Sequence, residues 1–239
     1  MTLIPKNIEE EKGDEEEKNI DSKDVVIDVL DKIMKSVAPH LRRRLNQIVS
    51  NSREDEVVAL YRIYRLLEFY GMMTLEKQLL SETGPITLAI TESAENAKQQ
   101  FEEVLDNLGD KLSTSPPSVM SDLSPPSVLR DVVDKMSKIL KTHSTSPSRG
   151  LEHEEREKAF LPTLTKFIQP LLRMCLLSAR TLNSGGETSI YMINCASTIQ
   201  SALKSYVVVE RISNRITQFK QLARVGVRTQ IRFCITLDE

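Results

Sequence analysis

Apolar residues recur every three or four positions along most of this chain, and this spacing constrains the fold more than any motif does. The most regular run is Ile90, Ala94, Ala97, Phe101, Val104, Leu108 and Leu112. Residues at such intervals share one face of an α-helix. Three heptads joined to further amphipathic segments are more typical of a bundle than of an isolated coiled coil. The sequence therefore predicts an all-α fold.

Residues 167–215 predict a helical hairpin. Its turn is Asn183-Ser184-Gly185-Gly186, and the last helix should begin near Glu187 and reach at least Arg215. Glycine after a helix end commonly caps the last carbonyl groups, which is the expected role of Gly185 and Gly186. A phosphate-binding loop is disfavoured, because no GxxxxGK[ST] motif and no preceding strand pattern occur here.

Prolines mark several expected helix boundaries. Thr83-Gly84-Pro85 should end one helix and start the next, with proline near the first helical position. Ser124 is expected to cap a helix whose first turn holds the two following prolines. A longer helix over residues 153–182 should restart or kink at one of its two internal prolines. These are Pro162 and Pro170.

Two N-terminal segments combine helical spacing with extensive apolar surface. Val25, Val29, Ile33 and Val37 recur at four-residue intervals on one face. Residues 54–80 are apolar around most of a helical circumference, which is typical of a helix packed on two sides. Its rows are Leu60, Tyr64 and Leu67, and Ile63, Leu66, Tyr70 and Met73.

Charge and proline content divide the chain into five expected parts. Residues 1–22 are strongly acidic and predict a disordered tail. Residues 23–112 and 125–224 predict two parts of a helical bundle, joined by a Ser/Pro-rich linker at 113–124. Residues 231–238 alternate like a strand. With no sheet for this segment to join, the tail at 225–239 is expected to be poorly integrated.

Composition narrows the class of function. The 32 Lys and Arg nearly balance the 34 Asp and Glu, whereas a dedicated nucleic-acid binder usually has a basic excess. No apolar run approaches the ~18–20 residues that span a bilayer, and the acidic N-terminus is no secretory signal. We therefore expect a cytosolic protein that reaches membranes through partners or surface contacts.

Residues able to carry chemistry are few. His40 lies beside three arginines, His143 in an expected Ser/Thr/Pro linker at 142–150, and His153 at the head of a charged turn. None has a second metal ligand at helical spacing, and no nucleophile–base set can be nominated. The sequence thus predicts no catalytic, cofactor-binding or metal-binding residues, and no enzymatic activity.

Cys175 and Cys195 each lie about ten residues from the centre of the hairpin turn. At ~1.5 Å rise per residue they should sit at similar heights, where they could face each other. Buried cysteine usually acts as a small apolar side chain, so packing is the favoured interpretation. With Cys234 the total is three, which indicates no disulfide framework.

Two surface features leave alternatives open. Ser115, Ser124 and Ser146 each precede proline in flexible sequence, so proline-directed phosphorylation competes with an ordinary linker role. Six basic residues recur about every four positions near the C-terminus. They would form a stripe for an acidic partner or anionic lipid, or simply a solvated face. They are Arg211, Arg215, Lys220, Arg224, Arg228 and Arg232.

Several segments in a fixed order resemble one known family. They are DVVIDVLDKIMKSVAPHLRRRLNQIV from Asp24, ALYRIYRLLEFYG from Ala59, FIQPLLRMCLLSA from Phe167 and YMINCASTIQSAL from Tyr191. Together they are similar to the central part of the sixth subunit of the conserved oligomeric Golgi complex, a vesicle tether. The resemblance covers about residues 24–215. Members of that family are expected to be longer at both ends.

The resemblance implies an elongated stack of helical hairpins or bundles and a non-enzymatic role. It implies work at the cytosolic face of the Golgi membrane, in retrograde intra-Golgi vesicle transport. Implied partners are the other subunits of the complex, SNAREs, Rab GTPases and golgins, with no nucleic acid and no cofactor. It also implies that the last helices expose apolar surface. The alternative from another class is a free-standing helical adaptor whose hairpins form an apolar peptide-binding groove.

Overall fold

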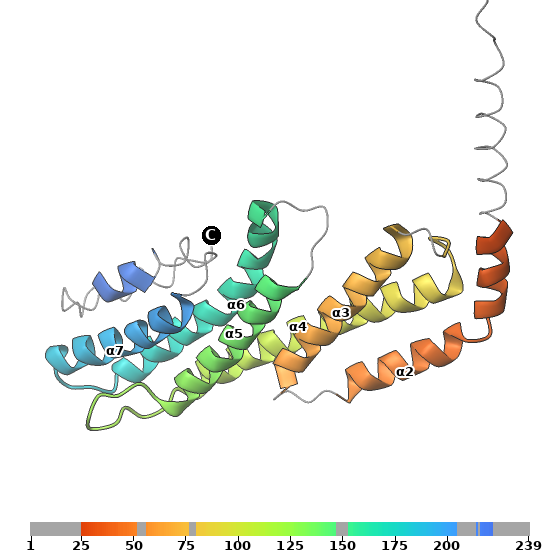
Figure 1. Cartoon of the computed structure of the whole chain (residues 1–239). Helices are drawn as coiled ribbons and strands as arrows, with labels where there is room; N and C mark the ends of the chain where they lie inside the picture. The colour runs from red at the N-terminus through yellow and green to blue at the C-terminus, as the bar shows by residue number, and fades with distance from the viewer. Residues whose placement is uncertain are drawn as a thin grey trace, which may run out of the picture. The chain divides into compact units, whose positions relative to one another are not determined.

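The computed structural model describes residues 25–51, 56–76, 80–146, 153–204, 214 and 216–221, and their regular secondary structure is entirely helical (Figure 1). The all-α prediction is therefore confirmed. The helices are α2 (Ala38–Ser50), α3 (Val57–Glu76), α4 (Pro85–Thr114), α5 (Ser127–Thr145), α6 (His153–Ala179) and α7 (Gly185–Leu203). Residues 25–34 and 216–221 are helical as well.

The chain divides into two compact units that do not follow its order. The first comprises residues 1–53 and 63–99, and the second comprises residues 54–62 and 100–239. Helices α3 and α4 each contribute to both units. The Ser/Pro segment at 113–124 lies inside the second unit, and the bundle ranges 23–112 and 125–224 stay a prediction.

In the first unit, the helix at residues 25–34 contacts the segment that leads into α4. The Asp31 carboxylate accepts a hydrogen bond from the Ser81 hydroxyl at 2.5 Å. A Cβ on Gly84 would lie 2.5 Å from Asp31 Oδ1, so only glycine lets the carboxylate approach this closely. Negative charge beside a helix N-terminus is favourable, and α4 begins at Pro85, as Thr83-Gly84-Pro85 predicted.

The second unit contains a three-helix core in which α5, α6 and α7 pack against one another. Its largest fully buried side chains include Leu129, Met136, Leu140, Leu164, Phe167, Leu171, Met174, Tyr191 and Ile199. The Ser/Pro segment is tied to this core, because Asn194 Nδ2 donates a 3.0 Å hydrogen bond to the Leu123 carbonyl. Because α6 and α7 pack against each other, the predicted helical hairpin is confirmed.

The start of α5 differs from the prediction. The helix begins at Ser127, and its N-cap is Pro126 in an extended conformation, with φ −64° and ψ 152°. Ser124 does not cap it. A residue that precedes proline is disfavoured in the helical region, which applies to both Ser124 and Pro125. The double proline thus delays the helix instead of filling its first turn.

The hairpin turn also differs from the prediction. Gly185 and Gly186 are the first residues of α7, with Ser184 as its N-cap, so they do not cap α6. Helix α6 ends at Ala179, and tight turns use its last carbonyls; the Leu182 amide, for example, donates to Ala179 O at 3.2 Å. Helix α7 ends at Leu203, and most of the expected extension toward Arg215 lies outside the described residues.

Helix α6 is continuous from His153 to Ala179 with both prolines inside it. No restart occurs at Pro162 or Pro170. Figure 1 shows its axis changing direction after the first turns, as expected when proline removes intrahelical hydrogen bonds. The acidic segment 1–22 and the segment 225–239 lie outside the described residues.

Candidate functional site

A buried aromatic cluster in the second unit contains a histidine that the sequence placed in a linker. His143 lies on α5 and is only 7% exposed. The Tyr61 hydroxyl and His143 Nδ1 are hydrogen-bonded at 2.8 Å. The imidazole stacks on Phe160 with a centroid distance of 4.2 Å. His143 therefore belongs to the core of the unit, where it joins the start of α3 to the end of α5 and to α6.

The sequence contained a pattern that indicates the burial of His143. His143 extends the apolar row of α5, whose members are Leu129, Val133, Met136 and Leu140, at an interval of three. The surrounding Ser, Thr and Pro residues masked that continuation. Of the other two histidines, His40 is exposed on α2. The side chain of His153 lies outside the described set.

The α6–α7 hairpin brings the two cysteines together, as the equal spacing from the turn predicted. Cys175 and Cys195 are both fully buried free thiols. A hydrogen bond to Cys195 and burial raise the pKa of the Cys175 thiol well above its ordinary value. Ser178 and Tyr191 are buried in the same hairpin. The pair thus lies within the packed core, in agreement with the interpretation as packing.

The buried thiols should resist alkylation in the native protein. The thiolate is the reacting species, and the raised pKa of Cys175 disfavours its formation there. At Cys195 the hydrogen bond with Cys175 lowers the pKa, so the protection of this thiol depends on its burial. We expect iodoacetamide to leave Cys175 and Cys195 unmodified in the native chain and to modify both in urea. Peptide mass spectrometry reads each site. Rapid native modification of Cys175 would contradict its burial.

An open groove of about 630 Å³ lies between α5 and α7 in the second unit. It is lined by Arg130, Val133, Asp134, Ser137, Ser197, Thr198, Ser201 and Ala202. Only two of these side chains are aliphatic. The groove therefore combines apolar surface with charged and hydroxyl side chains, and the adaptor alternative stays a prediction.

Large exposed apolar side chains gather in the first unit. Ten of the thirteen found among the described residues belong to it. They are Val25, Val26, Val29, Ile33, Val37, Ile48, Leu66, Tyr70, Leu75 and Leu88. Leu66 and Tyr70 belong to the second apolar row of α3, so the expectation that this helix is packed on two sides is wrong for that part of the row.

The three serines that precede proline differ in exposure. Ser115 is exposed at the end of α4, whereas Ser124 and Ser146 are half-buried. The Ser146 hydroxyl donates to the Thr142 carbonyl at 2.6 Å. Of the basic stripe, the described part of the chain includes only Lys220, whose ammonium donates to Gln200 Oε1. Regulation by phosphorylation and a role for the stripe stay predictions.

The described ranges contain no group of three or more His, Cys, Asp or Glu side chains placed to hold a metal ion. Within the same ranges, no helix combines the length and apolarity needed to cross a membrane. The absence of catalytic and cofactor-binding residues stays a prediction.

The fold defines an all-α protein built from packed helices, with apolar side chains exposed mainly on its first unit. The family is shown by sequence comparison: the model for the C-terminal region of conserved oligomeric Golgi complex subunit 6 matches residues 2–226. The chain belongs to that family, as the resemblance indicated.

Individual relatives agree with the family match. The chain is 25% identical over 214 residues to conserved oligomeric Golgi complex subunit 6 of Chaetomium globosum, covering 89% of this chain and 30% of the relative. It is 28% identical over 188 residues to that of Dictyostelium discoideum, covering 76% and 26%. The one from Arabidopsis thaliana is 27% identical over 156 residues, covering 65% and 22%. The chain thus spans under a third of these relatives. No solved structure matches it.

Proposed function

We propose that this chain serves as a non-enzymatic subunit of the conserved oligomeric Golgi complex, acting in retrograde intra-Golgi vesicle transport. The observation that carries the proposal is the family match over residues 2–226, nearly the whole chain. The relatives are named as subunits of that complex. The exposed apolar faces of the first unit support it, because a subunit buries such surface against neighbours.

The proposed location is the cytosolic face of the Golgi membrane, with peripheral attachment through partners. The absence of a membrane-spanning helix from the described residues is compatible with that attachment. The proposed partners are the other subunits of the complex, together with SNAREs, Rab GTPases and golgins. Their binding would use the exposed apolar helix faces of the first unit.

Affinity purification of the tagged chain at native expression, with quantitative mass spectrometry of what is recovered, tests the proposal. We expect the other subunits to be recovered well above a tag-only control. The double variant Leu66→Asp, Tyr70→Asp places charges on two exposed apolar positions of α3 in the first unit, so we expect it to recover less of the other subunits. Ile190→Asp, at an exposed apolar position of α7 in the second unit, is the control and should recover them as the unchanged chain does. Recovery of the intact tagged chain without any other subunit would contradict the proposed function.

A further inference from the structure

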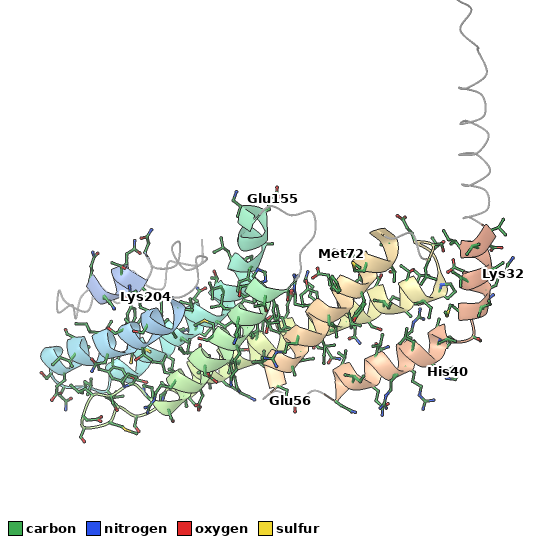
Figure 2. All side chains as sticks on the ribbon, in the orientation of Figure 1. Lys32, His40, Glu56, Met72, Glu155 and Lys204 are labelled. Atoms are coloured by element: carbon green, nitrogen blue, oxygen red, sulfur yellow. The ribbon has the colours of Figure 1, made fainter. Side chains whose placement is uncertain are left out.

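The contact between α6 and α7 is built from small side chains where the two cysteines meet. Cys175, Ser178 and Ala179 are buried on α6, and Cys195 and Ala196 are buried on α7. The two helices pack against each other, and Figure 2 shows their side chains filling the space between the ribbons. The distance between two helix axes depends on the size of the side chains at the contact. Small side chains therefore favour the close approach of two Cα atoms that a disulfide requires.

The two thiols are in direct contact in the reduced protein. The Cys175 thiol donates a hydrogen bond to the Cys195 sulfur, which raises the pKa of Cys175 and lowers that of Cys195. Both are free cysteines, so no disulfide joins them. Because the thiolate is the nucleophilic form of cysteine, this hydrogen bond makes Cys195 the better nucleophile of the two. Cys175 then lies where a second thiol can react with an oxidised Cys195, as in redox-sensitive cysteine pairs.

Two buried hydroxyl groups accompany the thiols. Ser178 follows Cys175 by three residues on α6, and Tyr191 precedes Cys195 by four on α7, so each shares a helix face with its cysteine. Burial and the nearby cysteines raise the pKa of Tyr191, which places its phenol beside the thiols. Among the described residues, neither Ser178 Oγ nor Tyr191 Oη has a hydrogen-bond partner. Buried hydroxyls are almost always paired, so these two donors are free to bind an oxygen atom that joins a cysteine sulfur.

We propose that Cys175 and Cys195 form a reversible disulfide in the native protein when it meets hydrogen peroxide. The Cys195 sulfur attacks one peroxide oxygen, the O–O bond breaks, and Cys195 becomes a sulfenic acid while one water leaves. The Cys175 sulfur then attacks the Cys195 sulfur, the S–O bond breaks, and the hydroxide leaves with the proton of Cys175 as a second water. The two thiols lose two electrons, which the peroxide accepts.

The disulfide would fasten α6 to α7 across the turn at residues 183–186. A cross-link restricts the unfolded chain, so the oxidised protein should unfold at a higher urea concentration than the reduced one. Hydrogen peroxide is much smaller than iodoacetamide, so local opening of the hairpin admits it more readily than the alkylating reagent. The inference does not depend on the proposed function, because it concerns only the core of the second unit.

Peroxide titration of the purified full chain tests the disulfide, in a Cys234→Ser background that removes the third thiol. After each dose the remaining thiols are alkylated in urea, and peptide mass spectrometry is run with and without reductant. We expect a cross-linked peptide pair containing Cys175 and Cys195 to increase with dose and to disappear on reduction with dithiothreitol. The proposal is overturned if both thiols stay reduced at doses that oxidise the urea-unfolded chain, or if they reach sulfinic acid without cross-linking.

Single variants in the same background test the order of the steps. In Cys175→Ser, Cys195 should stop at the sulfenic acid, which dimedone captures after unfolding. In Cys195→Ser, Cys175 should remain mostly a thiol. Preferential oxidation of Cys175 in these variants would overturn the assignment of Cys195 as the attacking residue.

The urea midpoint of the oxidised chain, followed by circular dichroism, tests the consequence for the hairpin. We expect a higher midpoint than for the reduced chain, and we expect dithiothreitol to restore the lower value. The Cys175→Ser variant treated with the same peroxide dose is the control and should show no such reversible rise. An oxidised midpoint equal to or below the reduced one would overturn the fastening of α6 to α7.

Discussion

Replacing Tyr61 by alanine should lower the free energy of unfolding by ~3–5 kcal/mol, the usual cost of removing a buried aromatic ring. Tyr61 is 3% exposed. Its ring centroid lies 5.1 Å from that of Phe101 and 6.0 Å from that of Phe160. Truncation would leave a cavity where α3, α4, α5 and α6 contribute residues to the second unit. Urea unfolding followed by circular dichroism measures the change.

Two further variants separate the ring from its hydroxyl. Tyr61→Phe keeps the ring and removes the 2.8 Å hydrogen bond with His143 Nδ1, so a loss of about 1–3 kcal/mol is expected. Tyr70→Ala is the matched control, because Tyr70 is 53% exposed. It should change stability by less than about 0.5 kcal/mol. Equal losses for Tyr61→Ala and Tyr70→Ala would show that Tyr61 is not part of a packed core.

Replacing Gly109 by leucine should destabilise the second unit by about 3 kcal/mol, since overpacking forces side chains and backbone to shift. A Cβ on Gly109 would lie 3.0 Å from Pro170 Cγ and 3.6 Å from its Cβ. The proline ring is rigid and sits within α6, so it has little room to move away. Urea unfolding of the full chain measures the loss.

Gly185→Leu is the control for that substitution, because no atom lies within 4 Å of a Cβ built on Gly185. It should leave stability nearly unchanged. Gly109→Ala should fall between the two, because alanine gains about 1 kcal/mol in helix propensity while its methyl group still meets Pro170. Wild-type stability of Gly109→Leu would mean that α4 and α6 do not approach closely at Gly109 and Pro170.

Features set by local spacing were predictable. The heptad from Ile90 to Leu112 lies in a single helix, α4. Counting outward from the turn correctly placed Cys175 beside Cys195, because each residue of an α-helix adds a fixed rise. Helix boundaries were less predictable. The start of α5 depended on the backbone of two prolines, and its end depended on His143 packing against Phe160.

The sequence by itself determined that this chain forms amphipathic helices and which residues share each face, because helical periodicity depends only on local geometry. Only the tertiary structure decided which of those faces are covered. Leu67 is 7% exposed and Leu66, its neighbour on the same apolar helix, is 55% exposed. Periodicity places them in different rows but cannot tell which row is covered, because burial depends on which other element lies against each face. The uncovered faces are where we expect partners to bind.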